Sequence, residues 1–208
     1  MDLLRALDWR YAVRRFADER IGEEQLQDLL TATRMSASSY GLQPYRLVVV
    51  ESEAVRRRLL PHSMGQDKVV HCSHLIVFAA QVDVGDGMVD RYMARLAEVR
   101  GLAADTLKGM SEHIKSALAA MTPAQRMEWA HQQAYIALGN LLTCAALMDI
   151  DSCPMGGIEA EGYDRELGLA EEGLATAVVC AIGLRHPEDS SAYLEKVRFA
   201  HREMVKVI

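Results

Sequence analysis

The chain contains 208 residues, of which half are hydrophobic and a quarter are charged. This balance is typical of one folded domain, and it excludes a disordered tail, a collagen-like rod and a small disulfide-stabilised protein. With 23 basic and 29 acidic residues the net charge is −6, so a general nucleic-acid-binding surface is not expected. The N-terminus lacks the apolar run of a signal peptide, and no stretch approaches the roughly 20 apolar residues of a membrane span. We therefore expect a single cytoplasmic domain over residues 1–208 that contacts no membrane.

Cysteines and histidines give little sign of a disulfide or a metal site. The cysteines lie in mostly apolar surroundings without close spacing, which favours reduced, buried thiols, at Cys72, Cys144, Cys153 and Cys180. His71 and His74 have a spacing that a metal could use, but they directly precede an apolar stretch, which favours local packing. No metal is expected.

The N-terminal part of the chain alternates between helical and strand patterns. Leu26, Leu29 and Leu30 recur at helical spacing and predict a helix over residues 23–35. The small residues, glycine and proline of residues 36–44 are typical of a turn. The other elements predicted here are helices over residues 2–9 and 51–60, and buried strands over residues 46–50 and 75–80.

The C-terminal part is dominated by one long helix. Residues 88–120 are helical but polar and are interrupted by Gly101. Thr122 and Gln125 form a capping box around Pro123 and predict the start of a helix that ends near Met148. Its last two-thirds is apolar on nearly every face, so it must be buried at the domain centre or against a second subunit. A last strand over residues 175–183 precedes a polar segment with no core of its own, and the whole predicts an α+β layer fold.

Familiar catalytic and phosphate-binding motifs are absent, but two basic clusters stand out. The sequence has no GxxxxGK[ST], GxGxxG, GxSxG or HExxH motif, and no catalytic side chain is predicted. One basic cluster includes Arg10, Arg14 and Arg15, and the other Lys196 and Arg198. Each alone is typical of solvated surface charge. If the two converge, they form a site for a doubly charged phosphate.

Two further segments offer backbone amides to a flat ligand, although each alone is ordinary turn chemistry. They are residues 38–41 and residues 153–157. In their order along the chain, these features resemble the FMN-dependent nitroreductase family. The resemblance covers nearly the whole chain through Arg10-Tyr-Ala-Val-Arg-Arg-Phe16, Ala37-Ser-Ser-Tyr-Gly-Leu-Gln-Pro-Tyr45, Gln66 and Lys68 before Cys72-Ser-His-Leu75, Leu138-Gly-Asn-Leu141, Pro154-Met-Gly-Gly157 and Lys196-Val-Arg198.

The resemblance implies a fold and an assembly. The fold is a three-layer α/β/α sandwich with a mixed or antiparallel central sheet, in an intertwined homodimer. Residues 88–120 correspond to the helical excursion that covers the substrate face in this family, although they match no quoted motif. The cofactor implied is non-covalent FMN, with NAD(P)H as the electron donor.

The resemblance also implies which residues bind FMN. Arg10, Lys196 and Arg198 would hold the phosphate, next to Tyr11 and Ala12. Arg14 and Lys68 would lie near N1 and O2 of the flavin, where reduction leaves negative charge, with Gln66 or Gly65 at the same edge. The remaining contacts would come from Ser38, Ser39 and Gly41 of the other subunit, and from Pro154, Met155, Gly156 and Gly157, one of whose backbone N–H groups would lie near N5.

Three positions depart from the family pattern. Ala12 replaces a small hydroxylic residue, which removes one phosphate hydrogen bond worth on the order of 1.5–3 kcal/mol. Gly41 stands where some members have asparagine, and Gly156 where others have glutamate. The expected ring environment is therefore more open and less acidic than in those relatives.

The resemblance implies an NAD(P)H-dependent oxidoreductase that reduces nitroaromatic, quinone or similar small-molecule acceptors by two-electron ping-pong hydride transfer. Two alternatives stay open. One is a flavin-binding protein without turnover, such as a sensor or a flavin store. The other is a metal-dependent enzyme that uses His71, His74 and a carboxylate.

Overall fold

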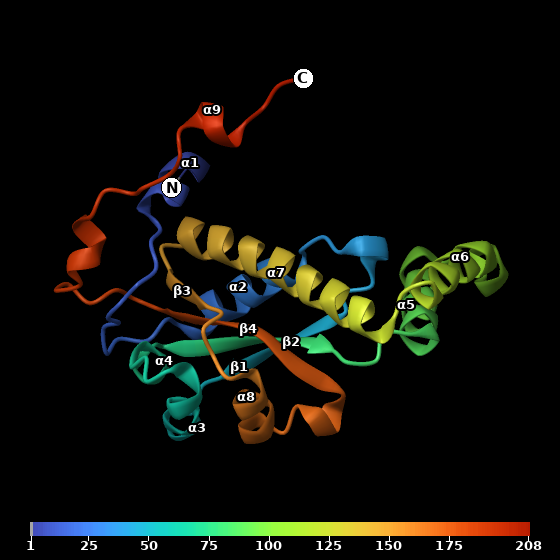
Figure 1. Ribbon diagram of the computed structural model, residues 1–208, viewed down its shortest axis with the longest axis horizontal. Coiled ribbons are helices and arrows are strands. Elements are labelled where there is room, and N and C mark those ends of the chain that lie inside the picture. The colour runs from blue at the N-terminus through green and yellow to red at the C-terminus, as the bar shows by residue number, and fades with distance from the viewer. Residues whose placement is uncertain (1) are drawn as a thin grey trace.

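A computed structural model describes residues 2–208, and within them the middle layer is a sheet of four strands (Figure 1). The strands lie in the order β1 (Tyr45–Val50), β2 (His74–Gln81), β4 (Leu174–Gly183) and β3 (Asp151–Met155). Each neighbouring pair is antiparallel. β1 and β3 are therefore the edges of the sheet, and β2 and β4 form its centre.

Helices cover both faces of this sheet (Figure 1). The α-helices are α1 (Leu3–Trp9), α2 (Glu23–Arg34), α3 (Glu53–Leu59), α4 (Lys68–His71), α5 (Asp86–Arg100), α6 (Lys108–Ala119), α7 (Pro123–Leu147), α8 (Ala160–Leu167) and α9 (His201–Met204). Short 3₁₀ helices occupy Ser39–Gly41 (η1), Pro61–Ser63, Ala104–Leu107, Ala170–Glu172 and Ser190–Tyr193.

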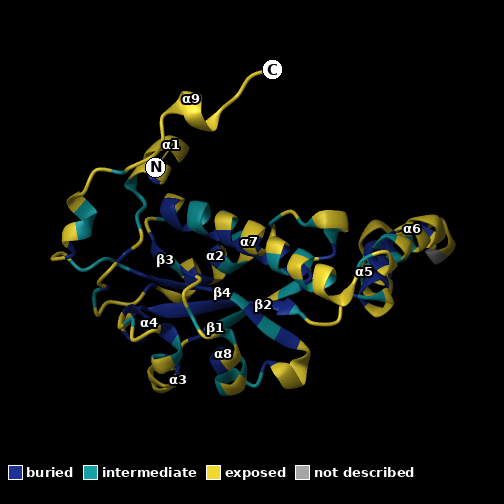
Figure 2. Cartoon of the chain, in the orientation of Figure 1, coloured by how far each residue is buried: buried dark blue, intermediate teal, exposed yellow. Residues whose placement is uncertain are grey.

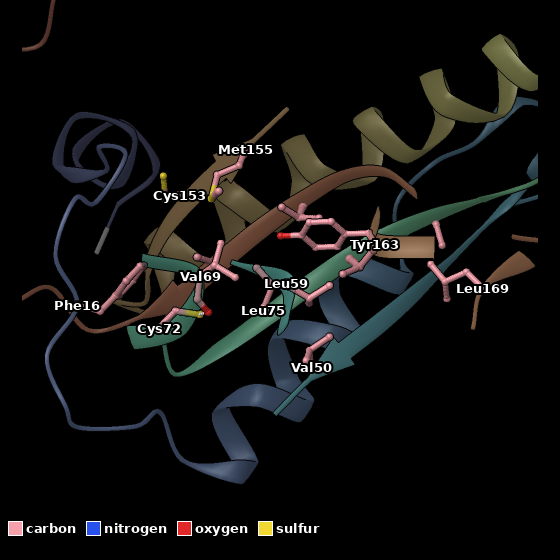
Figure 3. Close-up of a cluster of buried hydrophobic side chains, with 14 of the residues drawn as sticks. Phe16, Val50, Leu59, Val69, Cys72, Leu75, Cys153, Met155, Tyr163 and Leu169 are labelled. Atoms are coloured by element: carbon pink, nitrogen blue, oxygen red, sulfur yellow. Dashed lines mark hydrogen bonds between the residues drawn. The ribbon is translucent and has the colours of Figure 1, made fainter. Parts of the chain in front are cut away.

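The apolar run in β2 serves both faces because side chains alternate along a strand. Leu75 and Val77 point to the layer formed by α3, α4 and α8, where Tyr163 is the largest fully buried side chain (Figure 3). Its hydroxyl lies 2.7 Å from the Ser63 hydroxyl, so the buried polar group is satisfied. Ile76 and Phe78 point to the opposite layer, formed by α2 and α7.

α7 is the longest helix of the described chain and begins as the sequence predicts. The Thr122 hydroxyl accepts a hydrogen bond from the Gln125 N–H, and the Gln125 side chain accepts one from the Thr122 N–H, which completes the capping box. Its buried side packs on the sheet through small residues and leucines. The opposite side is not covered within one chain, because Tyr135 is 49% and Ile136 50% exposed.

α5 and α6 pack together at the far end of the sheet (Figure 1). Gly101 ends α5 with a φ of 62°, a conformation that glycine adopts without strain. Both helices share a separate apolar cluster with the start of α7, in which Met93 and Ile114 are buried. The predicted helical excursion over residues 88–120 is therefore a pair of helices.

Residues 185–208, here called the C-terminal segment, leave the sheet and run beside α1 (Figure 1). Most of the segment is exposed (Figure 2). Its exposed apolar side chains are Tyr193, Leu194, Val197, Phe199, Met204, Val205, Val207 and Ile208, and Leu3, Leu4 and Leu7 of α1 are exposed as well. No helix in the described part of the chain is both long and apolar enough to cross a membrane.

The predicted α+β sandwich is confirmed, and its sheet is antiparallel. One strand was not predicted: residues 153–155, interpreted as part of a turn, are the end of β3, and the turn begins at Gly156. Polar Asp151 and Ser152 hide the strand pattern, and Pro154 argues against a strand. Proline is tolerated in β3 because the strand lies at the edge of the sheet.

Candidate functional site

The two basic clusters of the sequence meet in one cavity. This first cavity, of about 930 Å³, lies between the loop after α1 and the C-terminal segment. Arg10 and Arg14 line it from the loop, and Lys196 and Arg198 from the C-terminal segment. The Lys196 ammonium donates hydrogen bonds to the backbone carbonyls of Leu7 and Arg10, which fixes it against the end of α1.

These cations have no direct ion-pair partner among the described residues, although Asp8 and Glu195 also line the cavity. Within residues 2–208 no carboxylate lies within 4.0 Å of the charged nitrogens of Arg10, Lys196 or Arg198. Partial burial and then the neighbouring Arg198 guanidinium lower the pKa of Arg10. Partial burial, Arg10 and Arg198 lower the pKa of Lys196. A cluster of repelling cations around a cavity is the arrangement that a multiply charged anion stabilises.

Arg14 connects the first cavity to a second one of about 470 Å³. Lys68, the first residue of α4, lines the second cavity and is 8% exposed. Its ammonium has no hydrogen-bond or ion-pair partner among the described residues. Although the residue as a whole is nearly buried, its ammonium keeps contact with the cavity, where a bound group with negative charge would pair with it.

The turn at Gly156 and Gly157 lies open beside these residues. The Gln66 side-chain amide donates a hydrogen bond to the Gly157 carbonyl at 3.4 Å, which brings two predicted site segments together. Both glycines are exposed. A side chain at position 156 would approach the Tyr135 hydroxyl, because an added Cβ would lie 3.6 Å from it. Gly65 and Met64 stand next to this turn, Met64 with its sulfur 3.7 Å from a Cβ added at Gly157.

Pro154 and Met155 differ in their surroundings. Pro154 lines the first cavity. The Met155 side chain is buried beside Cys153 in the core (Figure 3). Any contact of Met155 with a ligand in the cavities would therefore use its backbone.

Tyr11 and Ala12 anchor the arginine-bearing loop to the domain. The Tyr11 hydroxyl donates a hydrogen bond to Asp189 at 3.1 Å, and Ala12 makes an isolated bridge with Ser152 of β3. The Arg185 guanidinium lies over the Tyr11 ring, 4.6 Å from its centre, and pairs with Asp151. Sequence reasoning missed Asp189, because one more carboxylate in a polar segment gives no signal.

Residues 38–41 lie away from both cationic cavities, against α5 and α7. The Ser39 N–H donates to the buried Gln133 side chain of α7 at 2.8 Å, and Gly41 packs under Tyr92 of α5. Gly41 has a φ of 75°, and an added Cβ would lie 2.5 Å from the Tyr92 hydroxyl, so only glycine fits. Neither Ser38, Ser39 nor Gly41 lines either of the cationic cavities. A single chain therefore does not gather all the predicted site residues.

The two histidines have different surroundings: His71 is exposed and lines the second cavity, whereas His74 packs in the core. His74 is buried at the start of β2, with Nδ1 2.9 Å from the Ser73 hydroxyl, and burial lowers its pKa. In the described residues no group of three or more His, Cys, Asp or Glu side chains is close enough to hold a metal ion.

Comparison with known proteins agrees with this arrangement. The sequence profile of the Nitroreductase family matches residues 7–184. The chain is 29% identical over 214 residues to the major NAD(P)H-flavin oxidoreductase of Aliivibrio fischeri, covering 99% of this chain and 98% of that protein. The chain belongs to the nitroreductase family.

Solved structures share its fold. A nitroreductase family protein from Streptococcus pneumoniae superposes with a TM-score of 0.85 at 16% identity, over all of both chains. A structure from Exiguobacterium sibiricum, provisionally named a nitroreductase and solved in complex with FMN, has a TM-score of 0.85 at 18% identity and covers 100% of this chain and 98% of that one. The predicted family is thus confirmed, whereas the role of each site residue stays a prediction.

Proposed function

We propose that the chain is an FMN-dependent oxidoreductase that uses NAD(P)H to reduce nitroaromatic, quinone or similar small acceptors in two-electron, ping-pong turnover. The observation that carries this proposal is the convergence of Arg10, Lys196 and Arg198 on one cavity without a carboxylate partner in residues 2–208. Family membership and the names of relatives supply the reaction class. The cavity supplies a site of the right charge for a phosphate ester.

The chain's residues fit FMN at both of its ends. Arg10, Lys196 and Arg198 bind the phosphate. The first cavity is open to solvent, so the phosphate can enter it. Lys68 and Arg14 line the second cavity, where they would meet the edge of the flavin ring that becomes negatively charged on reduction. When bound, FMN supplies hydride acceptance from NAD(P)H and hydride donation to the acceptor. The protein's part is to bind, orient and stabilise charge, so no nucleophile or acid–base dyad is needed.

We propose that the working unit is a homodimer. The exposed side of α7 with Tyr135 and Ile136, the exposed leucines of α1 and the apolar side chains of the C-terminal segment are costly in water. A second copy of the chain would cover these surfaces, and it would bring residues 38–41 of one subunit to the cations of the other. Obligate interfaces of this kind bury roughly 2,000–5,000 Å².

Deletion of residues 196–208 is expected to weaken the dimer and to release flavin. The deletion removes Lys196 and Arg198 together with most exposed apolar side chains of the C-terminal segment. Light scattering and flavin absorbance measure the two effects on one sample. The matched control is K196A/R198A, which should lose flavin but keep the dimer. A full-length, flavin-loaded monomer of 23.1 kDa would contradict the dimer.

Visible absorption spectra test the function itself. The purified protein should be yellow, heat should release FMN as the main flavin, and anaerobic NADH or NADPH should bleach the colour. A nitroaromatic or a quinone should then restore it. A yellow protein that neither nucleotide bleaches would instead support a flavin-binding protein without turnover. Main release of FAD would overturn the assignment of the cofactor.

The state of the cysteines bears on the cellular compartment that we propose for the enzyme. All four cysteines are free, and burial raises the pKa of the Cys72 thiol to about 12. Unreactive reduced thiols suit a reducing compartment, so we place the enzyme in the cytoplasm, where NAD(P)H is found.

A further inference from the structure

Asp189 joins the two segments that carry the cations of the first cavity. Its Oδ2 accepts hydrogen bonds from the backbone N–H groups of Arg14 at 2.8 Å and Arg15 at 3.1 Å, and from the Tyr11 hydroxyl at 3.1 Å. Its Oδ1 accepts one from the Ser191 N–H at 3.0 Å. One side chain thus connects the loop after α1 to the start of the C-terminal segment, across about 175 residues of sequence.

Asp189 is 4% exposed, and its carboxylate is stabilised by these four hydrogen bonds. In residues 2–208 no basic side chain lies within 4.0 Å of the Asp189 carboxylate. The nearby Arg185 pairs with Asp151 instead. Burial alone would raise the pKa of Asp189, but the N–H donors of Arg14, Arg15 and Ser191 and the Tyr11 hydroxyl outweigh it and lower the pKa. The group is therefore held as a carboxylate, although it lies outside the cationic cavity itself.

We propose that Asp189 is a positioning residue for the phosphate-binding cations, holding Arg10 opposite Lys196 and Arg198. The inference rests on the proposed function, since it assumes that the first cavity takes the phosphate of FMN. The hydrogen bonds from the Tyr11 hydroxyl and the Arg14 N–H hold the loop directly after Arg10. The hydrogen bond from the Ser191 N–H holds the C-terminal segment five residues before Lys196. Without this connection, the hydrogen bonds of the Lys196 ammonium to the Leu7 and Arg10 carbonyls are left to hold the two segments together against the mutual repulsion of the cations.

Replacement of Asp189 by asparagine breaks the connection with a minimal change of shape. An amide has one oxygen and one NH₂ group, whereas donors face both oxygens of the carboxylate. Whichever way the amide turns, its NH₂ group faces an N–H donor on one side. The negative charge that strengthens the remaining hydrogen bonds is lost as well.

The test compares FMN with riboflavin, which has the same ring but no phosphate. The full-length protein is stripped of flavin, and the dissociation constants of both flavins are measured by fluorescence titration. In the wild type FMN should bind more tightly than riboflavin. D189N should reduce this preference by roughly tenfold, mainly by weakening FMN. The matched control is E188Q, because Glu188 carries the same charge one residue away but pairs with exposed Arg15 at the surface. Its preference should be unchanged.

Circular dichroism and thermal unfolding show whether D189N folds. If it does not, Y11F removes one of the four donors and should reduce the preference in the same direction by a smaller factor. An unchanged preference in the folded variant would overturn the inference. Equal weakening of both flavins would also overturn it, because it would indicate a general loss of stability. If the wild type itself binds neither flavin, or does not prefer FMN, the proposed function fails first and the inference falls with it.

Discussion

Replacing Arg10 and Arg198 together by alanine is expected to weaken FMN binding by roughly 10²–10⁴-fold. In the proposed site each arginine contributes a charge-assisted contact to the phosphate, worth about 1.5–3 kcal/mol, and both arginines line the same cavity. Riboflavin binding should change by less than about threefold, because riboflavin has no phosphate to lose. Fluorescence titration of both flavins measures the difference.

Salt and a matched variant sharpen this experiment. FMN affinity of the wild type should fall as ionic strength rises, and the variant should show a weaker salt dependence because fewer ion contacts remain to be screened. R5A/R202A is the control: it removes the same charge from α1 and α9, but neither residue lines the cavity. If R10A/R198A keeps wild-type affinity for FMN, the two basic clusters do not form a phosphate site.

The sequence predicts most of the fold because its signals are local. Alternating or continuous apolar residues mark β1, β2 and β4, and the Thr122 capping box marks the start of α7. β3 escapes detection because its stability comes from pairing with β4 and not from its own composition. The buried carboxylate of Asp151, for example, is paired with Arg185, which comes after β4, the strand next to β3 in the sheet.

The cationic site is predictable only in part, because some of its residues are positioned by contacts between distant parts of the chain. The order of the motifs suggests that Arg10 and Arg198 converge, and the structure brings them to one cavity. Sequence does not reveal the burial of Lys68, which depends on α4 packing beneath the sheet, or the hydrogen bonds of Asp189, which depend on a contact across the whole chain. Long-range contacts of this kind leave no periodic pattern.

Residues 38–41 show a further limit. Their backbone is fixed by Gln133 and Tyr92, so the loop has a defined shape before any ligand binds. Tyr40 holds a φ of 56° without being a glycine, a conformation that costs free energy and is often kept for a functional reason. Nevertheless the loop does not reach either cationic cavity in its own chain. The flavin contact proposed for residues 38–41 therefore requires the proposed homodimer, in which a second subunit brings its cations to the loop.

Replacing Arg14 by alanine is expected to slow flavin reduction about tenfold to a hundredfold while FMN stays bound. Arg14 borders both cavities, its backbone is held by Asp189, and its guanidinium has no carboxylate within 4.0 Å in the described residues. A cation at the ring edge stabilises the negative charge that two-electron reduction leaves there, and its loss costs about 1.5–3 kcal/mol. Stopped-flow bleaching by NADH or NADPH under anaerobic conditions gives the rate.

The reduction potential separates this role from a packing effect. The same loss of free energy should lower the two-electron potential of the bound flavin by roughly 30–60 mV, which an equilibrium dye titration measures. Arg15 provides the control, because R15A removes a charge that also borders the second cavity but is already paired with Glu188 at 2.8 Å. Its potential and rate should stay close to those of the wild type. If R14A has the potential of the wild type, Arg14 does not stabilise the reduced ring, and the stabilising charge must be sought at Lys68, which lines the same cavity.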